Sequence, residues 1–190
     1  MIDEKTAREA VIRAADELFY TRGVQAVGMD AVRTAAGVSL KRIYSLFASK
    51  DELIVAVLHH RTTIWDAGLA TTSERATSAR ERILAIFDFL DAWFREPDFR
   101  GCAFINAHGE LGASSSAVVD AVREQKRTFQ EYVARLVADA GAPPALAPQL
   151  AILAEGAQTT AAISGSPDAA HQARAAAETL IDGATGRLDR

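Results

Sequence analysis

The side chains at positions 39–45 are of the kinds that hydrogen bond with nucleic acid. The polar members of this run are Ser39, Lys41, Arg42, Tyr44 and Ser45. Their hydroxyl, ammonium and guanidinium groups can bond phosphate oxygens and base edges when a helix lies in the major groove of DNA. Ile43 and Phe47 stand one helical turn apart, which predicts a buried face. The polar side chains therefore predict the exposed face of a DNA-recognition helix.

The residues around this run predict a helix-turn-helix. Apolar side chains recur along 29–36 at the spacing of one helical face. Gly37 can adopt the positive φ that ends a helix, and Ser39 offers a side-chain oxygen that can cap the next one. Ser49 and Glu52 form an S-x-x-E capping box for a further helix. The recognition helix must therefore end by about residue 48.

Positive charge is concentrated beside the predicted recognition helix. Residues 33–50 contain four Lys or Arg and no Asp or Glu, although the whole chain has a net charge of -4. Residues 1–50 hold eight Lys or Arg against six Asp or Glu, and the remaining residues hold 13 against 19. This polarity orients the N-terminal part toward phosphate. Arg33, at the start of the basic stretch, is therefore predicted to belong to the DNA-binding surface.

The first fifty residues resemble the TetR family of transcriptional regulators. In that family an amphipathic first helix and a Gly-containing loop lead to A-G-V-S, then to a Tyr, a Phe and S-K. The matching segments here are AADELF at 14–19, Gly23, AAGVS at 35–39, Tyr44, Phe47, SK at 49–50 and LIVAVL at 53–58. The resemblance implies that Tyr44 and Lys50 contact backbone phosphates. The residues implied to face the bases are Ser39, Leu40, Lys41 and Arg42.

This chain departs from the family pattern at three places. Gly28 and Met29 stand where many members carry a Thr near the start of the second helix. Lys41 and Arg42 replace a frequent Gly-Thr, and Leu46 replaces a frequent His. Arg or Lys bonded to guanine O6 and N7 is the commonest specific base contact. Because these residues differ from the family pattern, the resemblance does not assign an operator sequence.

The rest of the chain also predicts helices, because no stretch alternates apolar and polar residues as strands do. We expect an all-α protein of about nine helices. The expected ranges are 4–21, 30–36, 39–48, a long helix from 50, 79–95, 102–111, 116–141, 146–164 and 168–188. We place an N-terminal three-helix DNA-binding domain at 1–48 and a C-terminal helical ligand-binding and dimerisation domain at 49–190.

Composition indicates an ordinary cytoplasmic protein with no membrane partner. The 190 residues are 49% hydrophobic, which is enough to bury a core. No N-terminal secretory signal and no apolar run of membrane-spanning length is present. Cys102 is the single cysteine, so no disulfide can form within the chain, and we expect it to be a small buried residue. No cofactor is expected.

The two last predicted helices are built largely of alanine and leucine. Their apolar stripes are Leu146, Leu150, Leu153, Ala157 and Ala161 on one helix, and Ala169, Ala173, Ala176, Leu180 and Ala184 on the other. Such stripes of mostly small residues allow close helix packing, either in the core of the chain or in a homodimer. A small recognition unit reads few bases, which favours a dimer on a twofold operator. The TetR resemblance implies the same four-helix interface.

Aromatic residues between 65 and 129 predict either a packed core or a ligand cavity walled by rings. On 102–111, Asn106 and Glu110 stand four residues apart and share a face, whereas His108 points elsewhere. Buried polar groups need partners, so Asn106 and Glu110 mark the polar end of a ligand site. The predicted ligand-binding residues are Trp65, Phe87, Phe104, Asn106, Glu110 and Phe129. The resemblance implies that this helix transmits ligand binding to the helix starting at 50.

The sequence therefore predicts a ligand-responsive transcriptional regulator and not an enzyme. By family expectation it is a repressor that binds a palindromic DNA operator as a dimer and is released by a small apolar or aromatic effector. A helical interaction module without DNA is one alternative, which the basic stretch argues against. A metal-sensing regulator is another, but His59 and His60 are adjacent and cannot chelate from one helical face. We find no Gly-rich phosphate loop, nucleophile elbow or cysteine cluster.

Overall fold

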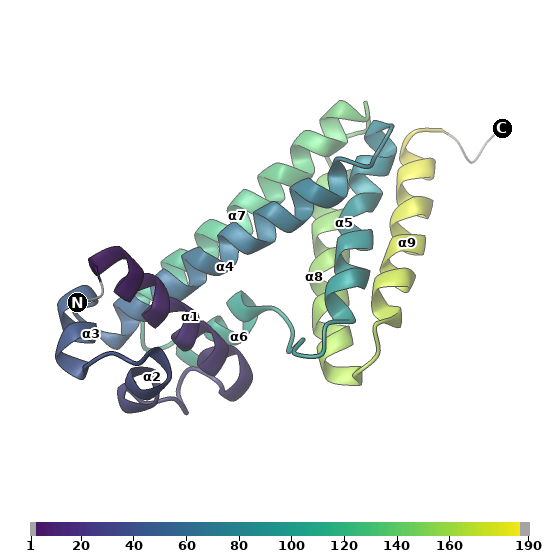
Figure 1. The fold of residues 1–190 in the computed structure, drawn as a ribbon. Coiled ribbons are helices and arrows are strands. Elements are labelled where there is room, and N and C mark those ends of the chain that lie inside the picture. The colour runs from purple at the N-terminus through teal and green to yellow at the C-terminus, as the bar shows by residue number, and fades with distance from the viewer. Residues whose placement is uncertain (1–2, 187–190) are drawn as a thin grey trace. The chain divides into compact units, whose positions relative to one another are not determined.

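A computed structural model describes residues 3–186, and every regular element in that range is an α-helix (Figure 1). The helices are α1 (Glu4–Arg22), α2 (Met29–Ala36), α3 (Leu40–Leu46), α4 (Lys50–Ser73), α5 (Ala79–Phe94), α6 (Ala103–Leu111), α7 (Ser116–Asp139), α8 (Leu146–Ser164) and α9 (Asp168–Ala184). The predicted all-α class is confirmed. The last helix is shorter than expected, because Gly186 turns the chain with a positive φ of 68°. Leu188, its predicted end, lies outside the described residues.

The chain divides into two compact units, each assembled from two separate segments. Of the described residues, the first unit holds 3–64 and 103–125, and the second holds 65–102 and 126–186. We call them the head unit and the body unit. The units do not follow the predicted division at 48/49, because α6 and the first part of α4 pack with the N-terminal helices. That division stays a prediction of where the DNA-binding domain ends.

The head unit is built on a small apolar core shared by α1, α2 and α3. Val11, Val32, Ile43 and Phe47 are all 0% exposed. Removing a side chain of this size from water stabilises the fold by about 1.5–3 kcal/mol. Gly37, with φ 66° and ψ 25°, ends α2 in the left-handed conformation, as predicted. The chain can therefore turn sharply and lay α3 against α1.

The predicted caps hold the short helices of the head unit in place. Ser39 Oγ accepts a hydrogen bond from the N–H of Arg42 at 3.1 Å, so α3 begins at Leu40. Ser49 Oγ accepts from the N–H of Glu52 at 3.1 Å, and a Glu52 carboxylate oxygen accepts from the N–H of Ala48 at 2.7 Å. The Ser49 half of the predicted capping box is confirmed, whereas Glu52 bonds the N–H of Ala48, one residue before the N-cap, and not that of Ser49. These two bonds lie between the end of α3 and the start of α4.

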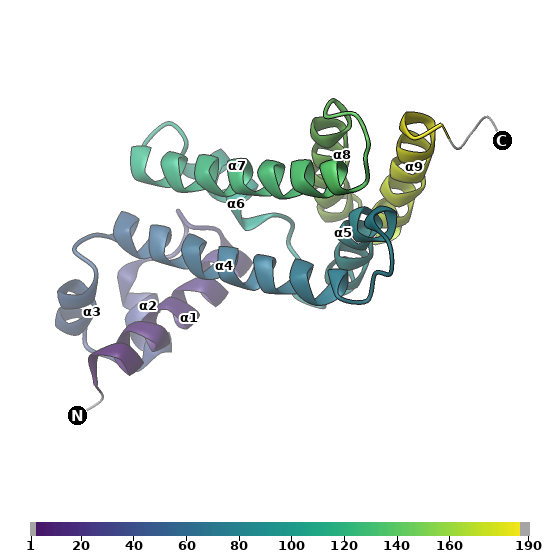
Figure 2. The same ribbon diagram turned by 90° about the horizontal axis from the view of Figure 1, so that it is seen from above.

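In the body unit, α5, α8 and α9 lie side by side in both views (Figures 1 and 2). Small side chains allow this close approach: Ala154 and Ala177 are 0% exposed. Most of the stripe that the sequence offered as a possible dimer contact is buried here within one chain. The buried members are Leu146, Leu150, Ala157, Ala161, Ala169 and Ala173. Assigning these residues to a dimer interface was wrong, because α5 covers the α8 and α9 faces from within the chain.

An aromatic cluster fills the other part of the body unit. The Trp65 ring of α4 meets Phe89 at 5.1 Å, Trp93 at 5.7 Å and Phe129 at 5.5 Å between centroids, each edge to face. This is the favoured geometry for aromatic pairs. Phe87 is 1% exposed and belongs to the same apolar core. Rings from α4, α5 and α7 therefore lock these helices together.

The packing of Gly68 against this cluster yields a testable prediction. A Cβ added at Gly68 would lie 2.3 Å from Phe89 Cε2, whereas one added at Gly109 of α6 has no atom within 4 Å. Gly68→Ala should lower the free energy of unfolding by about 1–3 kcal/mol, because the ring must leave its place. Gly109→Ala should raise it by up to about 1 kcal/mol through helix propensity. Urea unfolding measures both, and equal stabilisation by the two variants would contradict the tight packing.

Candidate nucleic-acid interface and ligand pockets

The polar face of α3 is exposed as the sequence predicted. Lys41 and Ser45 are exposed, Tyr44 is 47% exposed, and Arg42 is half-buried. Their orientation follows from Ile43, whose burial turns the opposite face of the helix outward. Ser45 Oγ donates to the Arg42 carbonyl at 2.7 Å. The helix thus presents an ammonium, a guanidinium and a phenol hydroxyl within one turn.

Two other members of the predicted surface have different surroundings. Leu40 is half-buried at the start of α3, and the Ser39 hydroxyl oxygen already caps that helix. A capping hydroxyl still carries a proton that it can donate. Ser39 can therefore cap α3 and donate a hydrogen bond outward at the same time.

The charge of Arg33 is partly neutralised by Asp30, which lies just outside the basic stretch at 33–50. Its Nε lies 3.1 Å from Asp30 Oδ1, one helical turn earlier on α2. Both side chains are well exposed, at 44% and 82%, so the pair adds little stability. The i, i+3 spacing could have revealed this pair from the sequence. The positive charge free to face an anion is therefore centred on α3 itself.

The loop between α1 and α2 is held from two sides. Lys50 Nζ, at the start of α4, donates to the Val24 carbonyl at 2.6 Å. On the other side, the Glu110 carboxylate of α6 accepts the N–H of Val24 at 3.1 Å and the N–H of Gln25 at 2.8 Å. The Gln25 side chain returns a hydrogen bond to the Glu110 carbonyl. We call the three hydrogen bonds between Glu110 and residues 24–25 the Glu110 latch. The latch connects α6 to the loop that leads into α2.

Gly23 opens this loop with a backbone conformation that is neither helical nor left-handed. Its φ is 85°, which favours glycine, and its ψ is 149°, which is extended. The extended ψ carries the next residues toward α6 instead of curling them back on α1. A Cβ at this position would lie 3.3 Å from both carboxylate oxygens of Glu110. The turn and the latch therefore depend on each other.

The predicted ligand-binding residues fall into two groups. Trp65, Phe87 and Phe129 belong to the body unit, whereas Phe104, Asn106 and Glu110 of α6 belong to the head unit. Phe104 is buried, at 4% exposure, while Asn106 is exposed. Each unit has a pocket of its own that includes part of the predicted set. Sequence spacing could not show this division, because it arises from how the helices pack.

One pocket of the body unit, which we call the body pocket, lies between α4 and α7 and measures about 230 Å³. It is lined by Trp65, Asp66, Leu69, Ala70, Thr128, Phe129, Tyr132 and Arg135. Burial raises the pKa of Asp66 above its ordinary value, because a carboxylate loses hydration there. Trp65 Nε1 is buried and has no hydrogen-bond partner among the described residues. The pocket therefore combines aromatic rings with the charged side chains of Asp66 and Arg135.

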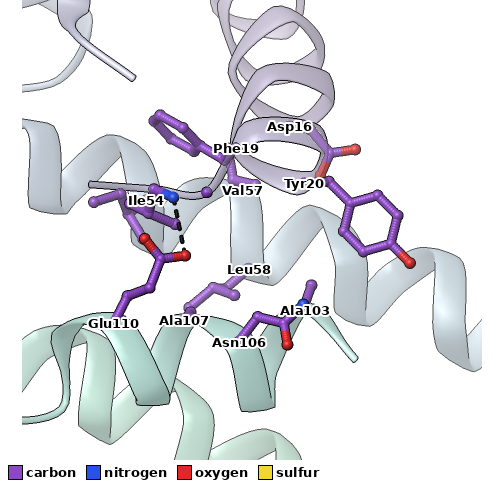
Figure 3. A pocket seen from close by; sticks show the side chains of 12 residues that line it. Asp16, Phe19, Tyr20, Ile54, Val57, Leu58, Ala103, Asn106, Ala107 and Glu110 are labelled. Carbon is purple, nitrogen blue, oxygen red and sulfur yellow. Dashed lines mark hydrogen bonds between the residues drawn. The ribbon is translucent and has the colours of Figure 1, made fainter. Parts of the chain in front are cut away.

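The pocket of the head unit lies between α1, α4 and α6 and measures about 140 Å³ (Figure 3). Asn106 and Glu110 both line it, so these two predicted residues do share one wall. Asp16 and Tyr20 of α1 also line it, although nothing in their spacing suggested a site. Asp16 Oδ1 accepts from Arg61 Nε at 2.5 Å, and the Arg61 guanidinium lies 4.1 Å from the Tyr20 ring centroid.

Among residues 3–186, no three His, Cys, Asp or Glu side chains are grouped so that they could hold a metal ion. No helix there is long and apolar enough to cross a membrane.

Comparisons with known proteins identify the family at both ends of the chain. The model of bacterial regulatory proteins of the tetR family matches residues 11–57. The model of the tetracyclin repressor-like C-terminal domain matches residues 79–177, more than half of the chain. The first match covers α2 and α3 with parts of α1 and α4, and the second runs from α5 into α9.

Individual relatives agree with these matches. A TetR-family transcriptional regulator from Streptomyces coelicolor superposes with a TM-score of 0.87 at 27% identity over 95% of this chain and 96% of that one. A protein from Streptomyces avermitilis, described as a TetR transcriptional regulator, gives a TM-score of 0.82 at 32% identity over 94% and 98%. The HTH-type transcriptional activator FasR of Mycolicibacterium smegmatis is 38% identical over 88 residues. That match covers 44% of this chain and 40% of FasR, so the chain spans less than half of this curated relative.

These regulators act by binding DNA and are not enzymes. Matches to both family models, a relative at 32% identity over nearly the whole chain and the exposed basic face of α3 agree with one another. The chain belongs to the TetR family of transcriptional regulators.

Proposed function

We propose that this protein is a ligand-responsive repressor that binds a palindromic operator as a dimer and is released by a small apolar or aromatic effector. The observation that carries the proposal is the exposed face of α3, where Lys41, Arg42 and Tyr44 stand on a helix fixed by a buried Ile43. Lys and Arg are the side chains that most often read guanine in the major groove. The Tyr44 hydroxyl suits a phosphate oxygen.

A gel shift with the intergenic DNA next to the gene tests the proposal. We expect binding to a fragment that contains an inverted repeat, and we expect the affinity to fall steeply as salt rises. Deleting the gene should raise transcription of the adjacent gene. Since FasR is described as an activator, a fall in transcription would instead make this chain an activator. No binding to promoter DNA or to any selected oligonucleotide at low salt would refute the proposal.

Dimerisation is proposed through the exposed face of α8. Ile152 is 71% exposed and Ile163 is 82% exposed, which is unusual for large apolar side chains. With Gly156 and Thr159, also exposed, they recur every three or four residues and form one stripe. The small residues at the centre of the stripe would let a second α8 approach closely. A twofold pair of head units would then reach two half-sites.

An effector is proposed to occupy the body pocket. Its walls include the rings of Trp65, Phe129 and Tyr132, which suit a flat apolar molecule. The buried Trp65 N–H has no partner among residues 3–186, so an effector that displaces its neighbours and brings an acceptor to it would gain a hydrogen bond. A tenfold loss of operator affinity requires about 1.4 kcal/mol of coupling, which is within the usual range for allostery.

Substitutions on α3 should separate base contacts from phosphate contacts. Arg42→Ala and Lys41→Ala should each weaken operator binding by about 1–3 kcal/mol, because each removes a donor to a base edge. Tyr44→Phe should weaken binding to all sequences alike. Fluorescence anisotropy with operator and scrambled duplexes measures these effects. Arg123→Ala, on an exposed position of α7, is the matched control, and an equal loss in that variant would contradict a role for α3.

The dimer interface can be tested with one charge at the end of the α8 stripe. Ile163→Glu should convert the dimer to a monomer, because a carboxylate would be buried without a partner. Ile64→Glu, on a position of α4 that is 51% exposed, is the matched control and should remain dimeric. Sedimentation velocity distinguishes the two species. A dimeric Ile163→Glu variant would place the interface elsewhere.

If the effector binds at Trp65, a substitution there should change the affinity for the effector more than the affinity for operator DNA. Trp65→Phe keeps a ring but removes the unpaired N–H, so effector affinity should fall about tenfold while operator affinity stays within about twofold. The effector for this test is a compound that both raises the melting temperature and releases operator DNA in a screen. Equal effector affinity in the two proteins would show that the indole N–H is not part of the site.

A further inference from the structure

The pocket of the head unit has the size and lining of a binding site for a small organic molecule. Its volume of about 140 Å³ is roughly ten times the volume that a cavity needs to hold one water molecule. Ile54, Val57 and Leu58 of α4 and Phe19 of α1 form apolar walls. Two of the four α6 residues on the lining, Ala103 and Ala107, have small side chains, which leaves space beside these walls (Figure 3).

The charges on the lining have one sign. The charged residues among its twelve described lining residues are Asp16 and Glu110, both carboxylates. The bond from Arg61 occupies one position on Asp16, and an ionised carboxylate can accept about four hydrogen bonds. Two cations stand outside the lining: Arg61 pairs with Asp16, and Lys50 bonds the carbonyl of Val24, the residue whose N–H bonds Glu110. Figure 3 shows Asp16 on α1 and Glu110 on α6, with Leu58 and Ala107 between them.

We propose that this pocket binds a small organic cation, a primary ammonium group on an apolar body of about one ring. The apolar body would cover Leu58 and Ala107, and the ammonium group would be bound by a carboxylate. Charge-assisted hydrogen bonds of this kind are about twice as strong as neutral ones. This site is separate from the effector site proposed at Trp65 and Phe129, because its lining residues all belong to the head unit.

Occupancy of this site acts directly on the Glu110 latch. An ammonium group at Glu110 competes with the N–H groups of Val24 and Gln25, which that carboxylate now holds. These residues lead into α2, which packs against α3. Loosening the loop lowers operator affinity. By thermodynamic reciprocity, operator DNA weakens binding of the cation by the same factor.

Benzylamine, compared with its neutral analogue benzyl alcohol, tests the site in the full-length protein without DNA. Methyl NMR follows Ile54, Leu58 and Ala107 during titration at neutral pH. We expect saturable shifts at these methyl groups and an affinity for benzylamine at least about tenfold higher than for benzyl alcohol. Equal affinities, shifts confined to the body unit, or no shift up to tens of millimolar would each overturn the proposal.

Substitutions locate the bound cation. Ala107→Leu fills the hollow and should abolish binding, and Ala103→Leu serves the same purpose if the first variant does not fold. Ala117→Leu, on an exposed position of α7, is the matched control and should bind benzylamine normally. Glu110→Gln should reduce the affinity for benzylamine to that for benzyl alcohol. Unchanged benzylamine binding in both the Leu variants and Glu110→Gln would overturn the site. Operator binding is measured in a separate experiment, so its outcome does not depend on whether benzylamine binds.

Discussion

The burial of Ile43 and Phe47 is the constraint on which the DNA-facing surface depends. A helix of seven residues such as α3 is not stable by itself in water. Its stability comes from placing one apolar face on α1 and α2, with Ser39 capping its first turn. Once that face is buried, the helical period places Lys41 and Tyr44 on the opposite, exposed face. The same packing that folds the head unit therefore sets the orientation of its DNA-binding side chains.

The Glu110 latch brings a later part of the chain into that arrangement. A carboxylate that accepts two backbone N–H groups fixes their position, since leaving either unpaired costs free energy. Lys50 holds the carbonyl of the same loop from α4. The loop before α2 is thus held by α6 and α4 together, and a displacement of either helix acts on Val24, to which both are bonded. α6 is therefore connected by direct hydrogen bonds to the loop that leads into α2.

Alanine has two roles in the body unit. Where it is buried, as at Ala154 and Ala177, it lets helix backbones approach closely and the chain form its own core. Where the surface of α8 is left open, large apolar residues stand outside that core at Ile152 and Ile163. A monomer gains nothing by exposing them. The distribution of small and large apolar residues therefore separates the surface that folds the chain from the surface available to a second copy.

The all-α class, the order of the helices and the exposed side of α3 could be predicted from the sequence. These depend on local rules: Gly37 ends a helix, Ser39 and the pair Ser49 and Glu52 cap the next two, and the helical period sorts the faces. Which apolar stripe is core depends on tertiary packing, since a stripe does not say what covers it. Tertiary packing also brings Asp16 and Glu110, 94 residues apart in the sequence, to the lining of one pocket. Long-range packing made these assignments, and no spacing along the chain encodes them.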